Sequence, residues 1–114
     1  MTFFNSFFSP QKEQSEQFVV LGVMEYKEAV INKEVQLVDV RTPREYRSGH
    51  LGNAINIDYY KSKQFMEAFA AFNKEKPVYL YCRSGARSAK AARKLIAMGF
   101  KKIYDLEGGI NNWR

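Results

Sequence analysis

Short apolar runs recur along the chain, and between them lie more polar stretches whose apolar residues follow helical spacing. The run before the single cysteine, Val78–Tyr81, shows no alternation of polar and apolar positions. Such a run predicts a strand that is buried on both faces of a parallel sheet. Four further strands are predicted, at Phe18–Leu21, Val35–Val40, Ala54–Ile57 and Lys102–Asp105.

Helical segments are predicted between these strands. A short helix is expected to begin at Pro43 with Thr42 as its N-cap, because proline suits the first turn and threonine accepts from free N–H groups. Ser62 is expected to cap another helix. The remaining helices are predicted at Glu25–Asn32, at Ser88–Met98 and after Gly108 and Gly109. The alternation indicates an α/β domain with a parallel sheet that helices cover on both faces.

The length of 114 residues favours one domain, which we place at residues 18–114. Residues 1–17 are polar apart from four phenylalanines, and we expect a partly disordered extension. These phenylalanines either pack on the domain, touch a partner or membrane surface, or belong to a loosely packed tail. The single cysteine and the lack of a signal peptide indicate a reducing compartment, and no stretch approaches the about 20 apolar residues of a membrane span. We therefore expect a soluble, cytoplasmic protein.

The net charge of +6 is concentrated in one part of the sequence. From Arg83 to Tyr104 there are seven basic residues and no acidic ones, whereas the rest of the chain is close to neutral. This surplus could steer a small anion toward the cysteine. For Lys90, Arg93 and Lys94, a solvated helix face is the favoured interpretation. Nucleic-acid binding is not expected, because the basic residues include no aromatic stacking platform and no nucleic-acid motif.

Cys82 is predicted to lie where the buried strand turns into a helix, and this position favours its thiolate. The free N–H groups of the helix start and the two arginines in the loop stabilise negative charge. Gly85 permits the backbone angles of a small loop, and Ser84 and Ser88 are expected to be loop and cap residues. No histidine is near in sequence, so the thiolate is expected to form without a base. The alternative is a buried structural thiol, which would not require two arginines and a glycine beside it.

Three stretches resemble the signatures of single-domain rhodaneses, a family of sulfurtransferases. They are residues 37–57, which begin Leu-Val-Asp-Val-Arg-Thr-Pro, the loop Tyr81–Ser88, and Asp105–Ile110 together with Trp113. The resemblance spans residues 18–114 and implies a five-stranded, mostly parallel sheet with helices on both faces. It also implies a ping-pong reaction in which Cys82 takes a sulfane sulfur from a small anionic donor such as thiosulfate and holds it as a persulfide. The acceptor would be cyanide, a thiol or a protein, and no cofactor or metal is implied.

The resemblance also assigns roles to single residues. The loop after the cysteine is implied to bind the donor and to surround the persulfide, and it consists of Arg83, Ser84, Gly85, Ala86, Arg87 and Ser88. Asp39, Arg41 and Glu45 are expected to form an internal ion-pair and capping set. His50 is expected to be structural, hydrogen-bonded beneath the strand edge.

The spacing between the cysteine and the second loop arginine bears on the alternative functions. Phosphatases and arsenate reductases that resemble this family have five residues between these positions, whereas Cys82 and Arg87 are separated by four. The shorter loop favours a sulfur atom over a tetrahedral oxyanion. A sulfur carrier or non-catalytic binding module is the other alternative, although relatives of that kind often lack the cysteine.

Overall fold

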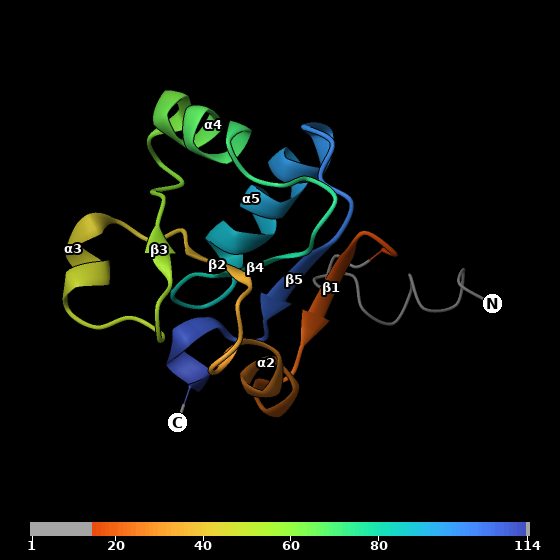
Figure 1. Cartoon of the computed structure of the whole chain (residues 1–114). Coiled ribbons are helices and arrows are strands. Elements are labelled where there is room, and N and C mark those ends of the chain that lie inside the picture. The colour runs from red at the N-terminus through yellow and green to blue at the C-terminus, as the bar shows by residue number, and fades with distance from the viewer. Residues whose placement is uncertain (1–14, 114) are drawn as a thin grey trace.

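The computed structural model describes residues 15–113, which form a five-stranded sheet with helices on both faces (Figure 1). The strands are β1 (Phe18–Leu21), β2 (Gln36–Asp39), β3 (Ile55–Asn56), β4 (Val78–Tyr81) and β5 (Ile103–Leu106). Their order in the sheet is β1-β5-β4-β2-β3, and all neighbouring strands are parallel. The predicted α/β architecture and its five strands are confirmed. The predicted extension lies outside the described residues, apart from residues 15–17.

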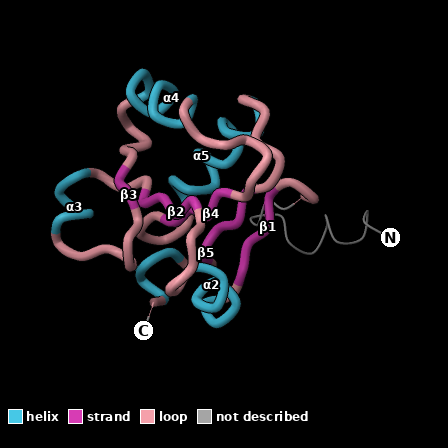
Figure 2. Tube along the Cα trace, viewed as in Figure 1, coloured by secondary structure: helices cyan, strands magenta, loops and turns pink. Residues whose placement is uncertain are grey.

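The helices form two layers around the sheet (Figures 1 and 2). On one face lie α4 (Ser62–Ala70) and α5 (Ala86–Ala97), and on the other lie α2 (Val23–Val30) and the 3-10 helix η1 (Gly109–Asn112). The short helix α3 (Pro43–Arg47) lies beside the edge strand β3. None of the helices within residues 15–113 has the length and the apolar character needed to cross a membrane.

Each face of the sheet has its own apolar layer. Phe65 and Phe69 of α4 and Leu95 of α5 are completely buried against one face. Tyr26 of α2 packs with Leu106 of β5 on the other face. Each fully buried side chain of this size contributes roughly 1.5–3 kcal/mol, so both layers stabilise the central strands.

Three helix starts differ from the predictions, and the first is that of α2, which begins at Val23 rather than Glu25. Ser62 does not cap α4, because Lys61 occupies the N-cap position without a side-chain hydrogen bond and Ser62 is the first helical residue. Helix α5 begins at Ala86 rather than Ser88, because Gly85 adopts a left-handed φ of 112° and turns the chain directly into the helix. The Thr42 cap of α3 is confirmed.

The carboxyl ends of three strands meet at one edge of the sheet. Asp39 at the end of β2 pairs in register with Tyr81 at the end of β4, and Leu80 pairs with Asp105 of β5. Cys82 follows Tyr81 directly and therefore lies at the middle of this edge. Ligands of open parallel sheets bind beyond the carboxyl ends of the strands, so this edge is where the candidate site is expected.

Candidate active site

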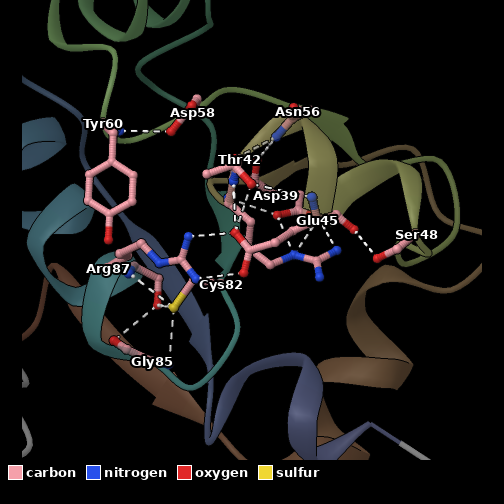
Figure 3. A network of polar contacts seen from close by, with 12 residues as sticks. Asp39, Thr42, Glu45, Ser48, Asn56, Asp58, Tyr60, Cys82, Gly85 and Arg87 are labelled. Carbon is pink, nitrogen blue, oxygen red and sulfur yellow. Dashed lines mark hydrogen bonds and ion pairs between the residues drawn. The ribbon is translucent and has the colours of Figure 1, made fainter.

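The sulfur of Cys82 is surrounded by polar groups from the start of α5. The residue is 1% exposed, and its backbone is fixed by β4 between two other strands. The sulfur accepts hydrogen bonds from the N–H groups of Gly85 at 3.0 Å and Ser88 at 3.4 Å, and Ser88 Oγ lies 3.4 Å away (Figure 3). Backbone N–H groups at a helix start that converge on one atom stabilise negative charge there. The arrangement therefore suits a thiolate.

The six loop residues named from the sequence take three different positions. Gly85 and Ser88 contact the sulfur. Arg83, Ser84 and Ala86 are exposed at the rim. Arg87 is half-buried and turns toward another segment of the chain.

Arg87 forms an ion pair with Glu45. Its Nη1 and Nη2 donate to Oε1 and Oε2 of Glu45 at 2.7 Å and 3.0 Å, and its guanidinium lies 5.5 Å from the ring centroid of Tyr60 (Figure 3). A paired geometry of this kind uses two of the five N–H donors of arginine and neutralises most of its charge. The two arginines expected to act alike thus differ, because Arg83 is exposed at the rim whereas Arg87 joins two segments.

Glu45 also caps helix α3. Its carboxylate accepts from the N–H of Thr42 at 3.0 Å, and its own N–H donates to the Thr42 hydroxyl at 3.3 Å. The hydrogen bond from Arg87 lowers the pKa of Glu45 to about 2, with further help from Thr42 and against the effect of burial. The carboxylate therefore stays ionised at neutral pH and ties α3 to the first turn of α5.

A second ion pair is buried after β2. Arg41 donates from Nε and Nη2 to the carboxylate of Asp39 at distances between 2.7 Å and 3.0 Å, and Nη2 also donates to the carbonyl of Gly49 at 2.7 Å. Asn56 donates to the backbone carbonyls of Asp39 and Arg41, both at 2.9 Å. This network fixes the turn that carries Glu45. No role was predicted for Asn56, whose signal was an amide side chain within a short strand.

His50 does not lie beneath the strand edge, contrary to the expectation from the sequence. It is exposed, and its ring stacks on Tyr46 with 3.8 Å between the centroids. Its Nδ1 lies 3.1 Å from the carbonyl of Tyr46, so the expected kind of hydrogen bond is present, but at the surface. The reason is the short turn after α3, which brings His50 back over the helix. Tyr46 in turn donates to the carbonyl of Ala54 at 2.6 Å.

The backbone of η1, near the C-terminus, is hydrogen-bonded to the backbone of the cysteine loop. The N–H of Ile110 donates to the carbonyl of Cys82 at 2.9 Å, and the N–H of Asn111 donates to that of Arg83 at 3.1 Å. Gly109 has φ of 66°, and a Cβ added there would lie 2.4 Å from the carbonyl of Arg83. This close approach was not predicted from the sequence.

Asp105 lies behind the loop, in the wall of a cavity of about 300 Å³ that Gly85 and Ala86 also line. It is 3% exposed, and its Oδ1 has no hydrogen-bond partner among the described residues. Burial raises the pKa of Asp105 to about 7, and the opposing effects of Ser88 and of the N–H of Leu106 are smaller. The sequence signal for this residue was an acidic side chain inside an otherwise apolar strand.

Together these groups suit a nucleophile that acts on a small anion. The sulfur is held among N–H donors, and an exposed arginine lies at the rim of the loop. Within residues 15–113, no group of three or more histidine, cysteine, aspartate or glutamate side chains is placed to hold a metal ion.

Comparisons with known proteins agree with this geometry. The sequence profile of the rhodanese-like domain matches residues 23–114. The chain is 34% identical over 91 residues to the thiosulfate sulfurtransferase GlpE of Coxiella burnetii, and the match covers 80% of this chain and 82% of that protein. It is also 41% identical over 81 residues to the uncharacterized protein YqhL of Bacillus subtilis, which covers 71% of this chain but only 62% of the relative.

Solved structures show the same fold. The rhodanese-like domain protein from Staphylococcus aureus superposes with a TM-score of 0.72 at 33% identity, covering 84% of this chain and 91% of that one. A rhodanese-related protein from Thermoplasma volcanium gives a TM-score of 0.71 at 30% identity, covering 83% and 89%. The resemblance drawn from the three sequence signatures is therefore confirmed.

Proposed function

The chain belongs to the family of rhodanese-like domains, and on this premise we propose that it is a sulfurtransferase that carries the transferred sulfur on Cys82. The observation that carries the proposal is the contact of the Cys82 sulfur with the N–H groups of Gly85 and Ser88. A thiolate and the persulfide anion formed from it are both stabilised by such donors. The loop would therefore support the free and the sulfur-loaded enzyme alike.

The reaction needs no redox partner. The Cys82 thiolate attacks the outer sulfur of thiosulfate, the S–S bond of thiosulfate breaks, and sulfite leaves with the bonding electron pair. The product on the enzyme is a Cys82 persulfide anion. Cyanide or a thiolate then attacks the terminal sulfur, and the Cys82 thiolate leaves. The relative named thiosulfate sulfurtransferase supports thiosulfate as a donor.

Arg83 is the residue that we assign to donor binding. It is exposed beside the loop, whereas the charge of Arg87 is balanced by Glu45. Thiosulfate carries two negative charges, so the start of α5 and Arg83, which has no ion pair within residues 15–113, would attract it. Arg87 would contribute mainly by fixing the first turn of α5, whose N–H groups face the sulfur.

The test is the mass of the protein after incubation with thiosulfate. We expect a gain of one sulfur atom, which cyanide removes with release of thiocyanate. Cys82→Ser is the matched control, since it keeps a small polar side chain but removes the nucleophile. Absence of the gain with thiosulfate and with other sulfane donors, or an equal gain in Cys82→Ser, would contradict the proposal.

A phosphatase or arsenate reductase is the alternative, and two observations disfavour it. The loop has four residues between cysteine and arginine, and Arg87 already binds a carboxylate. Hydrolysis of a phosphotyrosine analogue that depends on Cys82 would support this alternative. A sulfur carrier that discharges to a protein acceptor would form the same persulfide but would react slowly with cyanide, so the rate of the second step separates these two functions.

A further inference from the structure

The side chains of Arg87 and Glu45 meet in the geometry that arginine uses to bind oxyanions. Nη1 and Nη2 of Arg87 donate to Oε1 and Oε2 of Glu45 at 2.7 Å and 3.0 Å, so each carboxylate oxygen accepts from one nitrogen. Arginine binds phosphate and similar anions with the same pair of parallel hydrogen bonds. The Glu45 carboxylate therefore occupies the edge of the guanidinium on which a small oxyanion would otherwise bind.

This pairing takes place close to the reactive sulfur. The N–H groups of Gly85 and Ser88 contact the sulfur of Cys82. Arg87 directly precedes Ser88 in the first turn of α5, and in Figure 3 its side chain lies beside Cys82 and ends at the Glu45 carboxylate. The hydrogen bond with Glu45 raises the pKa of Arg87, against the effect of burial, and the charge of Cys82 acts in the same direction as Glu45. The guanidinium therefore lies within electrostatic range of the sulfur.

The Glu45 carboxylate is held in place independently of Arg87. Its Oε1 accepts from the N–H of Thr42 at 3.0 Å and from the Thr42 hydroxyl at 3.1 Å. Both side chains of the ion pair are half-buried, and the ring of Tyr60 lies 5.5 Å from the guanidinium. An anion that approaches Arg87 therefore meets a fixed negative charge.

We infer that Glu45 is a specificity-determining residue, which keeps tetrahedral oxyanions such as phosphate and arsenate off Arg87 and so away from Cys82. With the charge of Arg87 balanced, an anion is attracted by Arg83 and by the start of α5 and is held loosely. Loose binding suits a site in which an anion must arrive, give up one atom and leave. The inference rests on the proposed function only for this consequence, because the exclusion of oxyanions concerns binding alone.

The test compares the rates at which an anionic reagent, iodoacetate, and a neutral one, iodoacetamide, alkylate Cys82. Both reagents react with the same thiolate, so the ratio of their rates does not depend on the thiolate fraction and reports the attraction of an anion to the sulfur. Cys82 is the single cysteine of the sequence, so the reaction is specific. In Glu45→Gln we expect the ratio to rise about three- to tenfold at low ionic strength, because a negative charge near the sulfur is removed, and to rise less at high salt.

Three control variants separate the effect of charge from a loosened structure. Glu45→Asp keeps the charge, and its ratio should stay within about twofold of that of the parent protein. Thr42→Ala removes the hydroxyl that contacts Glu45 without a change of charge, and it should alter the ratio equally little. Combining Glu45→Gln with Arg87→Ala should abolish the rise, because the released cation is gone. An unchanged ratio in Glu45→Gln, an equal rise in Thr42→Ala, or a rise that persists without Arg87 would overturn the proposal.

Inorganic phosphate is the second probe, because it binds without any chemical step. Isothermal titration calorimetry should show that Glu45→Gln binds phosphate at least about tenfold more tightly than the parent protein does. The gain should be lost when Arg87→Ala is added. Equal affinities of Glu45→Gln and the parent protein would contradict the proposal.

A measurement on the parent protein covers the case in which Glu45→Gln does not fold. The Nε–H signal of Arg87 in nitrogen-15 NMR should not shift when millimolar phosphate is added, since Glu45 holds the guanidinium. A saturable shift would show that phosphate displaces Glu45, and the proposal would fail.

None of these measurements requires sulfur transfer. A protein that gains no sulfur from thiosulfate but shows the expected ratios would refute the proposed function and leave this inference intact. A protein that gains sulfur, and in which Glu45→Gln behaves like the parent protein, would have the opposite meaning.

Discussion

Substitution of Gly109 by alanine should destabilise the protein by displacing the cysteine loop. The added Cβ would lie 2.4 Å from the carbonyl carbon and oxygen of Arg83 and 2.6 Å from the nitrogen of Ser84. Favourable contacts of carbon atoms begin near 3.5 Å, so the two backbone segments must separate by about 1 Å. Both segments are main chain, and no side-chain rotation can relieve the contact.

The expected cost combines three contributions. Alanine at a φ of 66° costs about 1 kcal/mol. Crowding of a packed region typically costs about 1–3 kcal/mol. Weakening the hydrogen bonds from Ile110 and Asn111 to the loop adds about 0.5–1.5 kcal/mol for each bond that is lost. With one or both of these bonds lost, the sum is about 2.5–7 kcal/mol, which corresponds to a fall in Tm of at least about 10 °C for a domain of this size.

Gly52→Ala is the matched control for this experiment. Gly52 also has a left-handed φ, 46°, but nothing lies within 4 Å of the position that a Cβ would take. Its substitution should therefore cost only the backbone strain of about 1 kcal/mol, or about 4–8 °C in Tm. Thermal unfolding of the two variants measures the difference directly. Equal losses of stability would refute the conclusion that contact with the loop requires glycine at position 109.

Three further predictions concern other contacts. Because the pKa of Glu45 is lowered to about 2, the stability that the protein gains from the ion pair with Arg87 is fully present above pH 4.5 and is lost as the pH falls through 2. In urea unfolding, Glu45→Gln should therefore be about 1–2 kcal/mol less stable than the parent protein at pH 7. This difference in stability should disappear in acid. Tyr81→Phe removes the hydroxyl that accepts from the buried N–H of Leu51 at 2.9 Å and should cost about 1–3 kcal/mol in urea unfolding; a loss below measurement error would mean that this N–H finds another partner. Arg83→Ala should raise the KM for thiosulfate about three- to tenfold at low salt, with a smaller effect at high salt, and a KM that does not change would exclude donor binding by Arg83.

The central strand β4 was predictable from the sequence because it is a short apolar run that lies between two other strands and is almost completely buried. Val78–Tyr81 was predicted with the bounds that the structure shows. The start of α5 was misplaced because the deciding feature is the left-handed Gly85, and hydrophobic periodicity carries no information about one torsion angle. Ser62 was misassigned as a cap for a similar reason, since its residue type fits both the cap and the first turn.

Contacts between distant segments were the part of the site that the sequence could not predict. Glu45 and Arg87 are 42 positions apart, and no spacing rule pairs them. The packing of Gly109 on the loop depends on where η1 meets the end of β4, which only the assembled sheet determines. The residue types near the cysteine predicted an activated sulfur. The difference between Arg83, which is exposed, and Arg87, which binds Glu45, could be assigned only from their positions in the structure.

The order of the strands has a consequence for the synthesis of this protein on the ribosome. β1 is translated first among the strands, yet its neighbour in the sheet is β5, the last. About 85 residues separate Phe18 from its partner Ile103, which corresponds to roughly 4–17 s at ordinary translation rates. The backbone bonds that hold the cysteine loop come from Ile110 and Asn111, which are translated later still. The nascent chain therefore carries its cysteine in an incomplete site until the residues that follow β5 have been made.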